Sequence, residues 1–468
     1  MKERDAEYQR VLDARFIASL LATGLLVLSG IVIKTAMNVT FPTLMEEFGV
    51  GTSTVQWLTT GSLLVISCLV AASSYLKRRF KVRTLHLVSV LAFGLGTALA
   101  GWAMGFPMLL AGRLLQGAGQ AIALPLMYNI ILDQAPRDKM AFFMGTGSLI
   151  MALAPALGPS LGGLIVETWG WRWIFRMQLP LIAVSLVCGL AGIRQVRPVE
   201  RVRFPVIDYL LLVACFACLV IGVNQAAGAG WTSARVLALL AAALVLGAEF
   251  ASRSLETETP LIRLRTLRSR VFRCSIAMVL LIQFIMLGLG YLITNYPQLS
   301  LGADSFVAGI LLIPGCLLGA VLAPLSGGIA DRTGFREPIL VGGALMVLGT
   351  AALALLGTRL GLAFLALGYA LFFAGSACAS GNVMTFGLGK LPEQDKADGN
   401  ALFNTLQQLA GTVGTAVTTS IVAAAQYDAA DLAEGTAVGT QQAFILLFVL
   451  AVAALFCAMA ALRPPTRQ

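Results

Sequence analysis

Three basic side chains lie inside long apolar segments, where a charged group needs a specific partner or a path to water. Lys34, Arg113 and Arg176 are surrounded by mainly apolar residues, and Asp133 directly follows the apolar run 107–132. Ionisable groups in such segments are expensive to bury, and they usually mark ion or substrate paths. Proton exchange across a membrane needs a group that titrates as access alternates. If the chain exchanges protons in this way, Asp133 is the first candidate for the titrating group and Lys34 the second.

Two interpretations are open for each of these residues, and they are given in turn. The Lys34 ammonium extends to the outer membrane interface, since Arg15 to Lys34 spans roughly 28 Å of helix, or it projects inward with Arg113 and Arg176. Arg113 takes part in proton coupling or forms a hydrogen-bonding centre with Gln116, one helical turn away. Asp133 is a coupling carboxylate or an ordinary acid at the membrane interface.

The residue types needed for enzyme chemistry are missing or isolated. There is one histidine, His86, and no GxxxxGK[ST] loop that would bind ATP phosphates. Cys215 and Cys218 have C-x-x-C spacing, but no second pair or histidine lies nearby, so we interpret them as packing residues. The sequence predicts no enzyme activity, no cofactor and no metal site.

The composition indicates a membrane protein. Of 468 residues, 58% are hydrophobic and 12% charged, and the mean hydropathy is +0.85. Soluble domains have about 25% charged residues, and a spanning helix needs roughly 20 mostly apolar ones. We therefore predict an all-α membrane protein with fourteen spans, or twelve if the seventh and eighth are misread. The predicted spans are 16–38, 54–76, 84–104, 107–132, 140–166, 172–193, 207–227, 235–252, 272–296, 305–330, 338–357, 360–385, 400–425 and 440–462.

Most of the 33 Lys and Arg residues fall on one side of this arrangement, in the N-terminal tail and in turns such as 77–83, 194–203, 253–273 and 332–336. The positive-inside rule then puts both termini in the cytoplasm and requires an even number of spans. The net charge of +10 is explained by contact with anionic lipid, so nucleic acid is not an expected partner.

Several motifs occur in order along the chain. The turn 327–336 reads GGIADRTGFR, the segment 113–119 reads RLLQGAG, and 154–163 reads APALGPSLGG; further markers are NVTFP at 38–42 and WRWIF at 171–175. Together they resemble the major facilitator superfamily, in its branch of fourteen-helix drug:proton antiporters (multidrug efflux permeases). The first-half copy of the turn, 74–83, departs from the family pattern because it contains no acid and begins with Ser74. Ile33 stands where that branch has an Asp.

The resemblance implies two six-helix bundles, residues 1–193 and 272–468, joined by a linker, 194–271, with two extra helices. It implies a monomeric secondary transporter of the bacterial inner membrane that exports amphipathic small molecules, such as drugs, in exchange for protons. It also implies a part for Arg113 in proton coupling. Two alternatives stay open: transport of an anionic metabolite or lipid, suggested by the three buried cations, and a sensor or scaffold that does not transport.

Candidate residues for movement lie in two motifs. Small residues recur every four positions in 154–162, which permits close helix approach, and prolines there can bend the helix. We expect a hinge or sliding contact, with static packing as the alternative, at Pro155, Gly158, Pro159 and Gly162. At the turn, a carboxylate can cap a helix or pair with a base and latch one conformation, or it is simply a solvated ion pair; these residues are Gly327, Asp331, Arg332 and Gly334.

Uncharged polar and aromatic side chains in the spans are expected to contact the substrate, because a mostly apolar site with a few hydrogen-bonding groups accommodates varied shapes. Many of them are individually explained by helix packing. The expected substrate-binding residues are Asn38, Gln116, Arg176, Gln283, Tyr291, Asn295, Tyr369, Phe373, Asn404 and Gln408.

Overall fold

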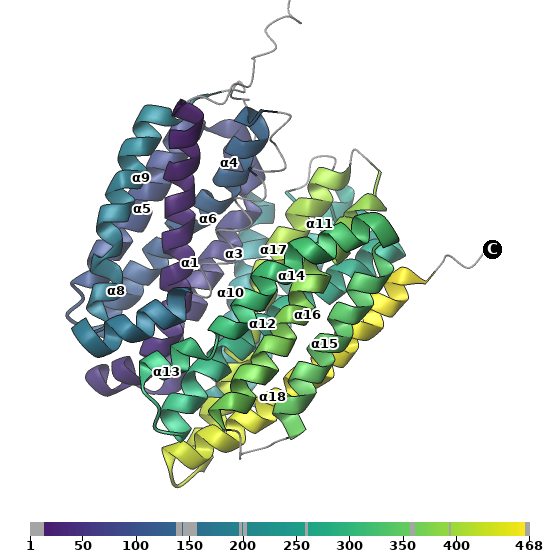
Figure 1. Ribbon diagram of the computed structural model, residues 1–468. Helices are drawn as coiled ribbons and strands as arrows, with labels where there is room; N and C mark the ends of the chain where they lie inside the picture. Colours follow the sequence, from purple (N-terminus) through teal and green to yellow (C-terminus); the bar gives the residue numbers. More distant parts are fainter. Residues whose placement is uncertain are drawn as a thin grey trace, which may run out of the picture.

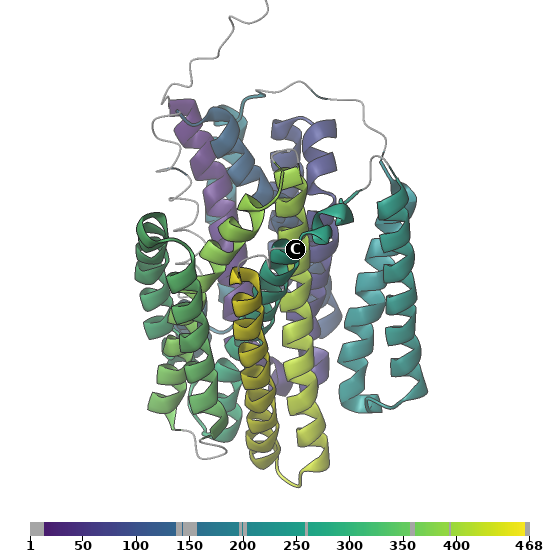
Figure 2. The same cartoon turned by 90° about the vertical axis from the view of Figure 1, so that its right-hand side faces the viewer.

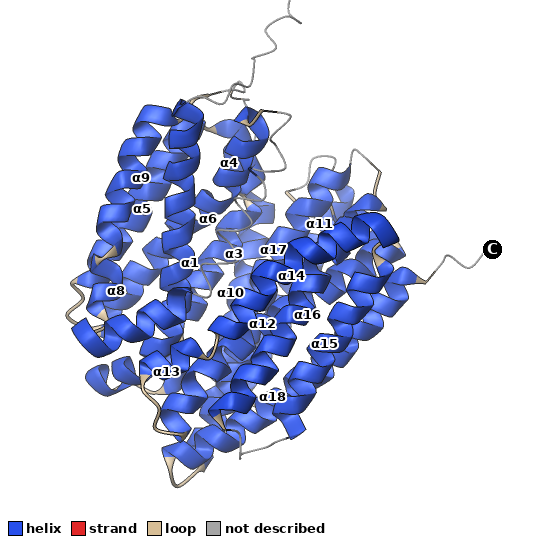
Figure 3. Cartoon of the chain, in the orientation of Figure 1, coloured by secondary structure: helices blue, strands red, loops and turns tan. Residues whose placement is uncertain are grey.

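The computed structural model describes residues 14–136, 143, 157–195, 199, 204–257, 261–355, 361–392 and 395–463. Every regular element in these residues is a helix (Figure 3). Thirteen helices are long and apolar enough to cross a membrane. They coincide with thirteen of the predicted spans, including the seventh and eighth. Most of the fifth predicted span, 140–166, lies outside the described residues, and its part 157–166 is helical. The prediction of an all-α membrane protein is confirmed.

The first helices pack together as one bundle, here called the first bundle (Figure 1). The elements are α1 (Ala14–Phe48), α2 (Thr52–Val55), α3 (Trp57–Ala71), α4 (Ser73–Arg79), α5 (Val82–Gly101), α6 (Phe106–Gln134), the helical residues 157–169, α8 (Arg172–Arg176) and α9 (Gln178–Gly192).

The last helices form the second bundle. Its elements are α12 (Arg270–Ser300), α13 (Ser305–Ile310), α14 (Ile313–Thr333), α15 (Arg336–Leu355), α16 (Leu362–Gly389), α17 (Lys396–Asp428) and α18 (Leu432–Leu462).

Between the bundles in sequence lie α10 (Val206–Ala229) and α11 (Ala234–Glu256), which form a hairpin at the edge of the molecule (Figure 2). Arg253 Nε donates to Asp208 Oδ1 at 2.8 Å and joins the two helices near one end. The hairpin packs through α10 against α17, where Ser420 Oγ donates to the Val223 carbonyl at 2.8 Å. The short 3-10 helix η2 (Leu264–Arg268) then leads into α12.

One end of the molecule carries the predicted basic turns and is called the basic end below. Here Arg83 at the start of α5 donates to the Leu190 carbonyl near the end of α9. Arg263, just before η2, pairs with Asp395 and Asp398 at the start of α17, at 3.9 and 3.3 Å. Since successive long helices run in alternating directions, the turns 77–83 and 332–336 lie at this same end (Figure 1).

Candidate functional site

The two bundles touch closely at the end opposite the basic end. The helical residues 157–169 lie between α1 and α13: a Cβ added at Gly158 would overlap Thr35 Oγ1, and one added at Gly163 would overlap the Ser305 carbonyl. A Cβ at Gly309 of α13 would likewise overlap the Pro159 carbonyl. Because these residues are small, the backbone of 157–169 can approach both α1 of its own bundle and α13 of the second bundle closely.

Polar contacts reinforce this closure across the bundles. Asn295 Nδ2 of α12 donates to the Asn38 carbonyl of α1 at 3.1 Å, and the rings of Phe41 and Tyr291 lie 6.3 Å apart. Glu167 Oε1 accepts from the backbone N–H of Ser305 at 3.0 Å. Asn38, Tyr291 and Asn295, which the sequence proposes as substrate residues, are thus brought together at the contact between the bundles.

Two further contacts join α17 to the first bundle. Thr52 Oγ1, at the start of α2, donates to Gln426 Oε1 at 2.7 Å near the far end of α17. Ser67 Oγ of α3 lies 3.4 Å from Thr412 Oγ1, near the middle of α17. Sequence reasoning missed Thr52 and Gln426. The signal was present, because polar residues recur at helical spacing along one face of α17.

Toward the basic end the same face of α17 becomes exposed. Thr412 is fully buried, Gln408 one turn earlier is half-buried, and Asn404 and Asn400 are exposed. These residues share a face because they are four positions apart. The bundles are therefore in contact from the opposite end to the middle of the molecule and separate toward the basic end.

Arg113 is buried in the first bundle with 2% of its surface exposed. Its Nε donates to the Leu58 carbonyl of α3 at 3.2 Å, and its Nη1 donates to Gln116 Oε1 at 2.7 Å. Gln116 Nε2 in turn donates to Thr97 Oγ1 of α5 at 2.8 Å. Arg113 and Gln116 thus join three helices in one polar network. Lys34 of α1 interacts electrostatically with Arg113.

Arg176 lies away from this pair. Its Nε donates to the Gly101 carbonyl at the end of α5, at 2.8 Å, and its guanidinium lies over the rings of Trp102 and Trp173, at 5.1 and 5.6 Å from the centroids. This is an aromatic cluster at the end opposite the basic end. The structure brings Lys34 and Arg113 together but does not bring Arg176 to them.

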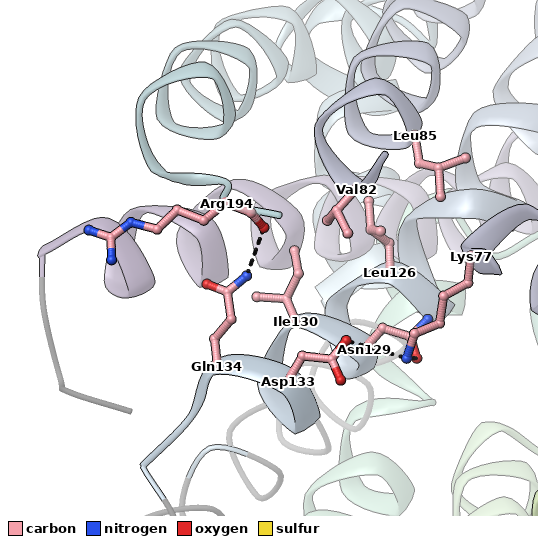
Figure 4. Close-up of a pocket in the computed structure, with 9 residues that line it drawn as sticks. All are labelled: Lys77, Val82, Leu85, Leu126, Asn129, Ile130, Asp133, Gln134 and Arg194. Carbon is pink, nitrogen blue, oxygen red and sulfur yellow. Dashed lines mark hydrogen bonds and ion pairs between the residues drawn. The ribbon is translucent and has the colours of Figure 1, made fainter. Parts of the chain in front are cut away.

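Asp133 lies at the basic end of α6, beside α4 (Figure 4). Its Oδ2 is 3.5 Å from Lys77 Nζ, which also donates to Asn129 Oδ1 at 2.8 Å. Both residues line a small pocket that Gln134 closes by donating to the Arg194 carbonyl at 3.3 Å. The first-half turn, 74–83, has no acid of its own, and one of its basic residues, Lys77, is paired instead with Asp133 of the neighbouring helix α6.

The aromatic residues predicted in α16 pack within the second bundle. A Cβ added at Gly315 of α14 would be 2.7 Å from the Tyr369 ring, and one at Gly319 would be 2.8 Å from the Phe373 ring. The Tyr369 and Phe373 ring centroids are 5.3 Å apart, and both side chains are buried. Their rings fill the groove between α14 and α16.

Amides in α12 and α17 face one another nearer the interface between the bundles. Gln407 Nε2 donates to Gln283 Oε1 at 3.1 Å, and both side chains are half-buried. Asn404 donates to the Asn400 carbonyl one turn earlier, at 2.9 Å. Gln283 and Asn404 thus lie on the part of the second bundle that opens toward the basic end.

The predicted latch residues are at the basic end of α14. Asp331 and Arg332 are exposed, and within the described part of the chain no side-chain hydrogen bond or ion pair involves either of them. Gly334 ends the helix with φ +92, a conformation that favours glycine. No atom lies within 4 Å of a Cβ added at Gly327. Pro155, predicted for the hinge, lies outside the described residues.

Among the residues described, no group of three His, Cys, Asp or Glu side chains is placed to hold a metal ion. The eight cysteines are free thiols in or beside helices.

The chain is similar to known membrane proteins along nearly all of its length. A family model described as Major Facilitator Superfamily matches residues 22–415. The lincomycin resistance protein LmrB of Bacillus subtilis (strain 168) is 32% identical over 446 residues, which are 93% of this chain and 92% of that protein. The multidrug resistance protein B homolog of Mycobacterium tuberculosis (strain ATCC 25618 / H37Rv) is 30% identical over 418 residues, or 87% and 77% of the two chains.

Solved structures show the same fold at low sequence identity. The POT family transporter PepTSo has a TM-score of 0.67 at 15% identity and covers 96% of each chain. A D-xylose-proton symporter has a TM-score of 0.64 at 16% identity and covers 94% of this chain and 96% of its own.

Thirteen helices long and apolar enough to cross a membrane, packed as two bundles with a hairpin beside them, define a multi-pass membrane protein. The chain belongs to the major facilitator superfamily, whose members are transporters rather than enzymes. The resemblance recognised from the motifs is confirmed.

Proposed function

We propose that this protein is a secondary active transporter that exports amphipathic small molecules in exchange for protons. The basic end faces the cytoplasm of a bacterial cell, both termini lie there, and the protein acts in the inner membrane as a monomer. Residues 1–193 and 272–468 act as the two moving units, and 194–271 links them. Substrate enters from the basic end and leaves at the opposite end after the bundles rock about their interface.

The observation that carries this proposal is the uneven contact between the bundles. Face residues of α17 are buried at Thr412 and exposed at Asn404 and Asn400, while Gly163 and Gly309 lie at closed backbone contacts between the bundles. An alternating-access transporter must open one end while the other is shut, and this arrangement fits the state open toward the cytoplasm.

The names of the relatives support drugs as the substrate class, since lincomycin resistance and multidrug resistance are attributed to proteins about 30% identical to this chain. For proton coupling we propose Asp133 first and Lys34 second, with Arg113 tuning the interior charge. Substrate contacts would come from Gln116 inside the first bundle and from residues at the bundle interface that can hydrogen-bond or stack: Asn38, Gln283, Tyr291, Asn295, Asn404 and Gln408. Arg176, Tyr369 and Phe373 would support the site from the packing around it.

Movement would depend on two regions. The stripe Gly158, Pro159 and Gly162, with Pro155 before it, would slide or bend against α1 and α13 as the closed end opens. The exposed turn that contains Asp331 and Arg332 lies between Gly327 and Gly334, and it would bind the first bundle when the basic end closes.

Transport by purified protein in proteoliposomes tests the proposal. With an acidic lumen and a neutral exterior, we expect radiolabelled lincomycin and amphipathic dyes to accumulate on the acidic side, and a proton ionophore to abolish the accumulation. Protein-free liposomes are the control. No flux of any probe, with or without a gradient, would favour a sensor or scaffold and overturn the proposal. Flux that ignores the pH gradient would remove proton coupling alone.

A further inference from the structure

Two positively charged side chains, Lys34 of α1 and Arg113 of α6, lie on packed helices of the first bundle. Arg113 of α6 uses Nε and Nη1 on the Leu58 carbonyl and on Gln116. Its Nη2 is buried and makes no hydrogen bond to any described residue. A buried charged donor without a partner is costly, since it loses its water and gains nothing in return. The arrangement therefore has an unused donor in its interior.

Lys34 of α1 lies beside the helix that carries this network. A Cβ added at Gly30 of α1 would be 2.8 Å from the Gln120 side chain of α6. Because α1 and α6 are antiparallel, Lys34, one turn beyond Gly30, lies at the level of Gln116, one turn before Gln120. Lys34 is half-buried, and no hydrogen bond or ion pair joins its ammonium to a described residue.

The ends of α1 are out of reach for this ammonium. Lys34 is 14 residues before Phe48 and 20 after Ala14, or about 21 and 30 Å along the helix. These distances are several times the length of a lysine side chain. Lys34 lies one turn toward the basic end from Asn38, whose carbonyl accepts from Asn295 across the closed contact, so it shares the face of α1 that meets the second bundle.

Acidic partners are absent from this region in the described residues. Within the two bundles, every described Asp and Glu lies in a loop or within three residues of a helix end. Two like charges inside a membrane protein repel each other and lose hydration, so an anion between or beside them is strongly favoured. About 7 Å further along α6 from Gln116, toward the basic end, Leu287 of α12 packs against an apolar cluster that includes Leu63, Ile66 and Ala121 of α3 and α6.

We propose that the transported molecule is an amphipathic organic anion, whose carboxylate or other oxyanion binds the Lys34 ammonium with Arg113 behind it. The apolar part of the molecule lies toward Leu287 and its neighbours. This inference rests on the proposed transport function, but it ranks an organic anion above a basic drug such as lincomycin as the preferred substrate. It differs from a site for cationic drugs, which would need a carboxylate where this interface carries a lysine.

The test uses one fluorophore with three charges: dansylglycine as the anion, dansylglycinamide as the neutral probe and dansylcadaverine as the cation. Proteoliposomes are assayed for saturable flux of each. We expect wild-type protein to transport the anion about tenfold faster than the cation at equal low concentration, the size of one charge-assisted contact. Lys34→Gln should remove this preference, and Lys34→Arg should retain it. Lys81→Gln removes an exposed lysine at the basic end and should leave the preference unchanged.

Each outcome has a defined meaning. Faster transport of the cation by wild-type protein, or an unchanged anion preference in Lys34→Gln, would overturn the anion site while leaving transport intact. Flux of none of the probes would overturn the transport function itself. Inorganic phosphate, added as competitor, separates a free anion from an organic one: inhibition by phosphate at concentrations as low as those of dansylglycine would overturn the amphipathic substrate. Thermal unfolding of Lys34→Gln and Lys34→Arg checks that both fold like wild type.

Discussion

The third and fourth membrane-spanning helices of each bundle, α5 with α6 and α15 with α16, pack in the same way. In the first bundle, a Cβ added at Gly96 of α5 would be 2.6 Å from the Gly112 carbonyl of α6. In the second, one added at Gly349 of α15 would be 2.7 Å from the Gly368 carbonyl of α16. A second contact follows seven residues away in both pairs, at Ser89 with Gly119 and at Gly342 with Gly375. Two sequences with little visible similarity thus share one close helix crossing.

This shared register aligns residues that differ in chemistry. Arg113 follows Gly112, and Tyr369 follows Gly368. Arg113 donates to the Leu58 carbonyl of α3, whereas the Tyr369 ring packs against Gly315 of α14. The next turn continues the contrast, with Gln116 in α6 and Phe372 in α16.

The comparison teaches that backbone packing is repeated while charge is not. The first bundle carries the cations and their hydrogen-bonding network, and the second presents amides and aromatic rings. Such an unequal division suits a substrate with one charged end and one apolar body. It also predicts that substitutions at the shared crossings act alike, whereas substitutions of polar groups act differently in the two halves.

The largest effect is expected where the bundles meet each other rather than within either one. Gly163→Leu would force a side chain into the Ser305 backbone at the start of α13, so the closed end could not form and transport should be lost. Membrane expression should persist, because the contact lies at a surface between units. Gly381→Leu is the control, since no atom lies within 4 Å of its Cβ. Normal transport by Gly163→Leu would disprove a moving contact here.

The next prediction tests the repeat directly. Gly96→Leu and Gly349→Leu each place a side chain against a backbone carbonyl of the neighbouring helix. Overpacking of this kind costs about 1–3 kcal/mol or more, so both variants should unfold at clearly lower temperatures, and by similar amounts. Thermal unfolding of the purified protein in detergent measures this. A large loss in only one variant would show that the two crossings are not equivalent.

Much of this architecture could be predicted from residue types. Apolar length and the basic turns give the spans, because lipid excludes charge and each spanning helix satisfies its own backbone. The motif 154–163 indicated close packing, and Gly158 and Gly162 do lie against α1. These features depend on local sequence, so one chain is enough to read them.

The partners of the polar residues could not be predicted in the same way. Nothing near Lys77 in sequence indicates Asp133, because their contact depends on how α4 and α6 pack. Arg176 looked like a third interior cation, yet the turn after 157–169 places it among tryptophans. Thr52 and Gln426 meet only because the bundles do. Long-range packing decides such pairs, and periodicity shows only which face is polar.

The smallest effect on substrate flux is expected at the basic end. Here the positions of the acidic and the basic residue are exchanged between the two bundles. The first bundle has a base on α4, Lys77, paired with an acid at the end of α6, Asp133. The second has its acid at the end of α14, Asp331, and a base directly after α16, Lys390. The Lys77 side chain is 26% exposed and the Asp133 side chain 9% exposed, so removing either partner leaves the other charge partly buried.

Two matched variants separate pairing from proton transfer at this site. Asp133→Asn and Lys77→Gln both break the same ion pair, but only the first removes a carboxylate. If Asp133 carries the proton, Asp133→Asn should lose accumulation driven by a pH gradient while downhill flux falls less than about threefold, and Lys77→Gln should keep gradient-driven accumulation. Proteoliposome flux with and without an imposed gradient measures both. Equal behaviour of the two variants would assign Asp133 to the ion pair alone and leave Lys34, in the charged half of the interface, as the group that couples protons to transport.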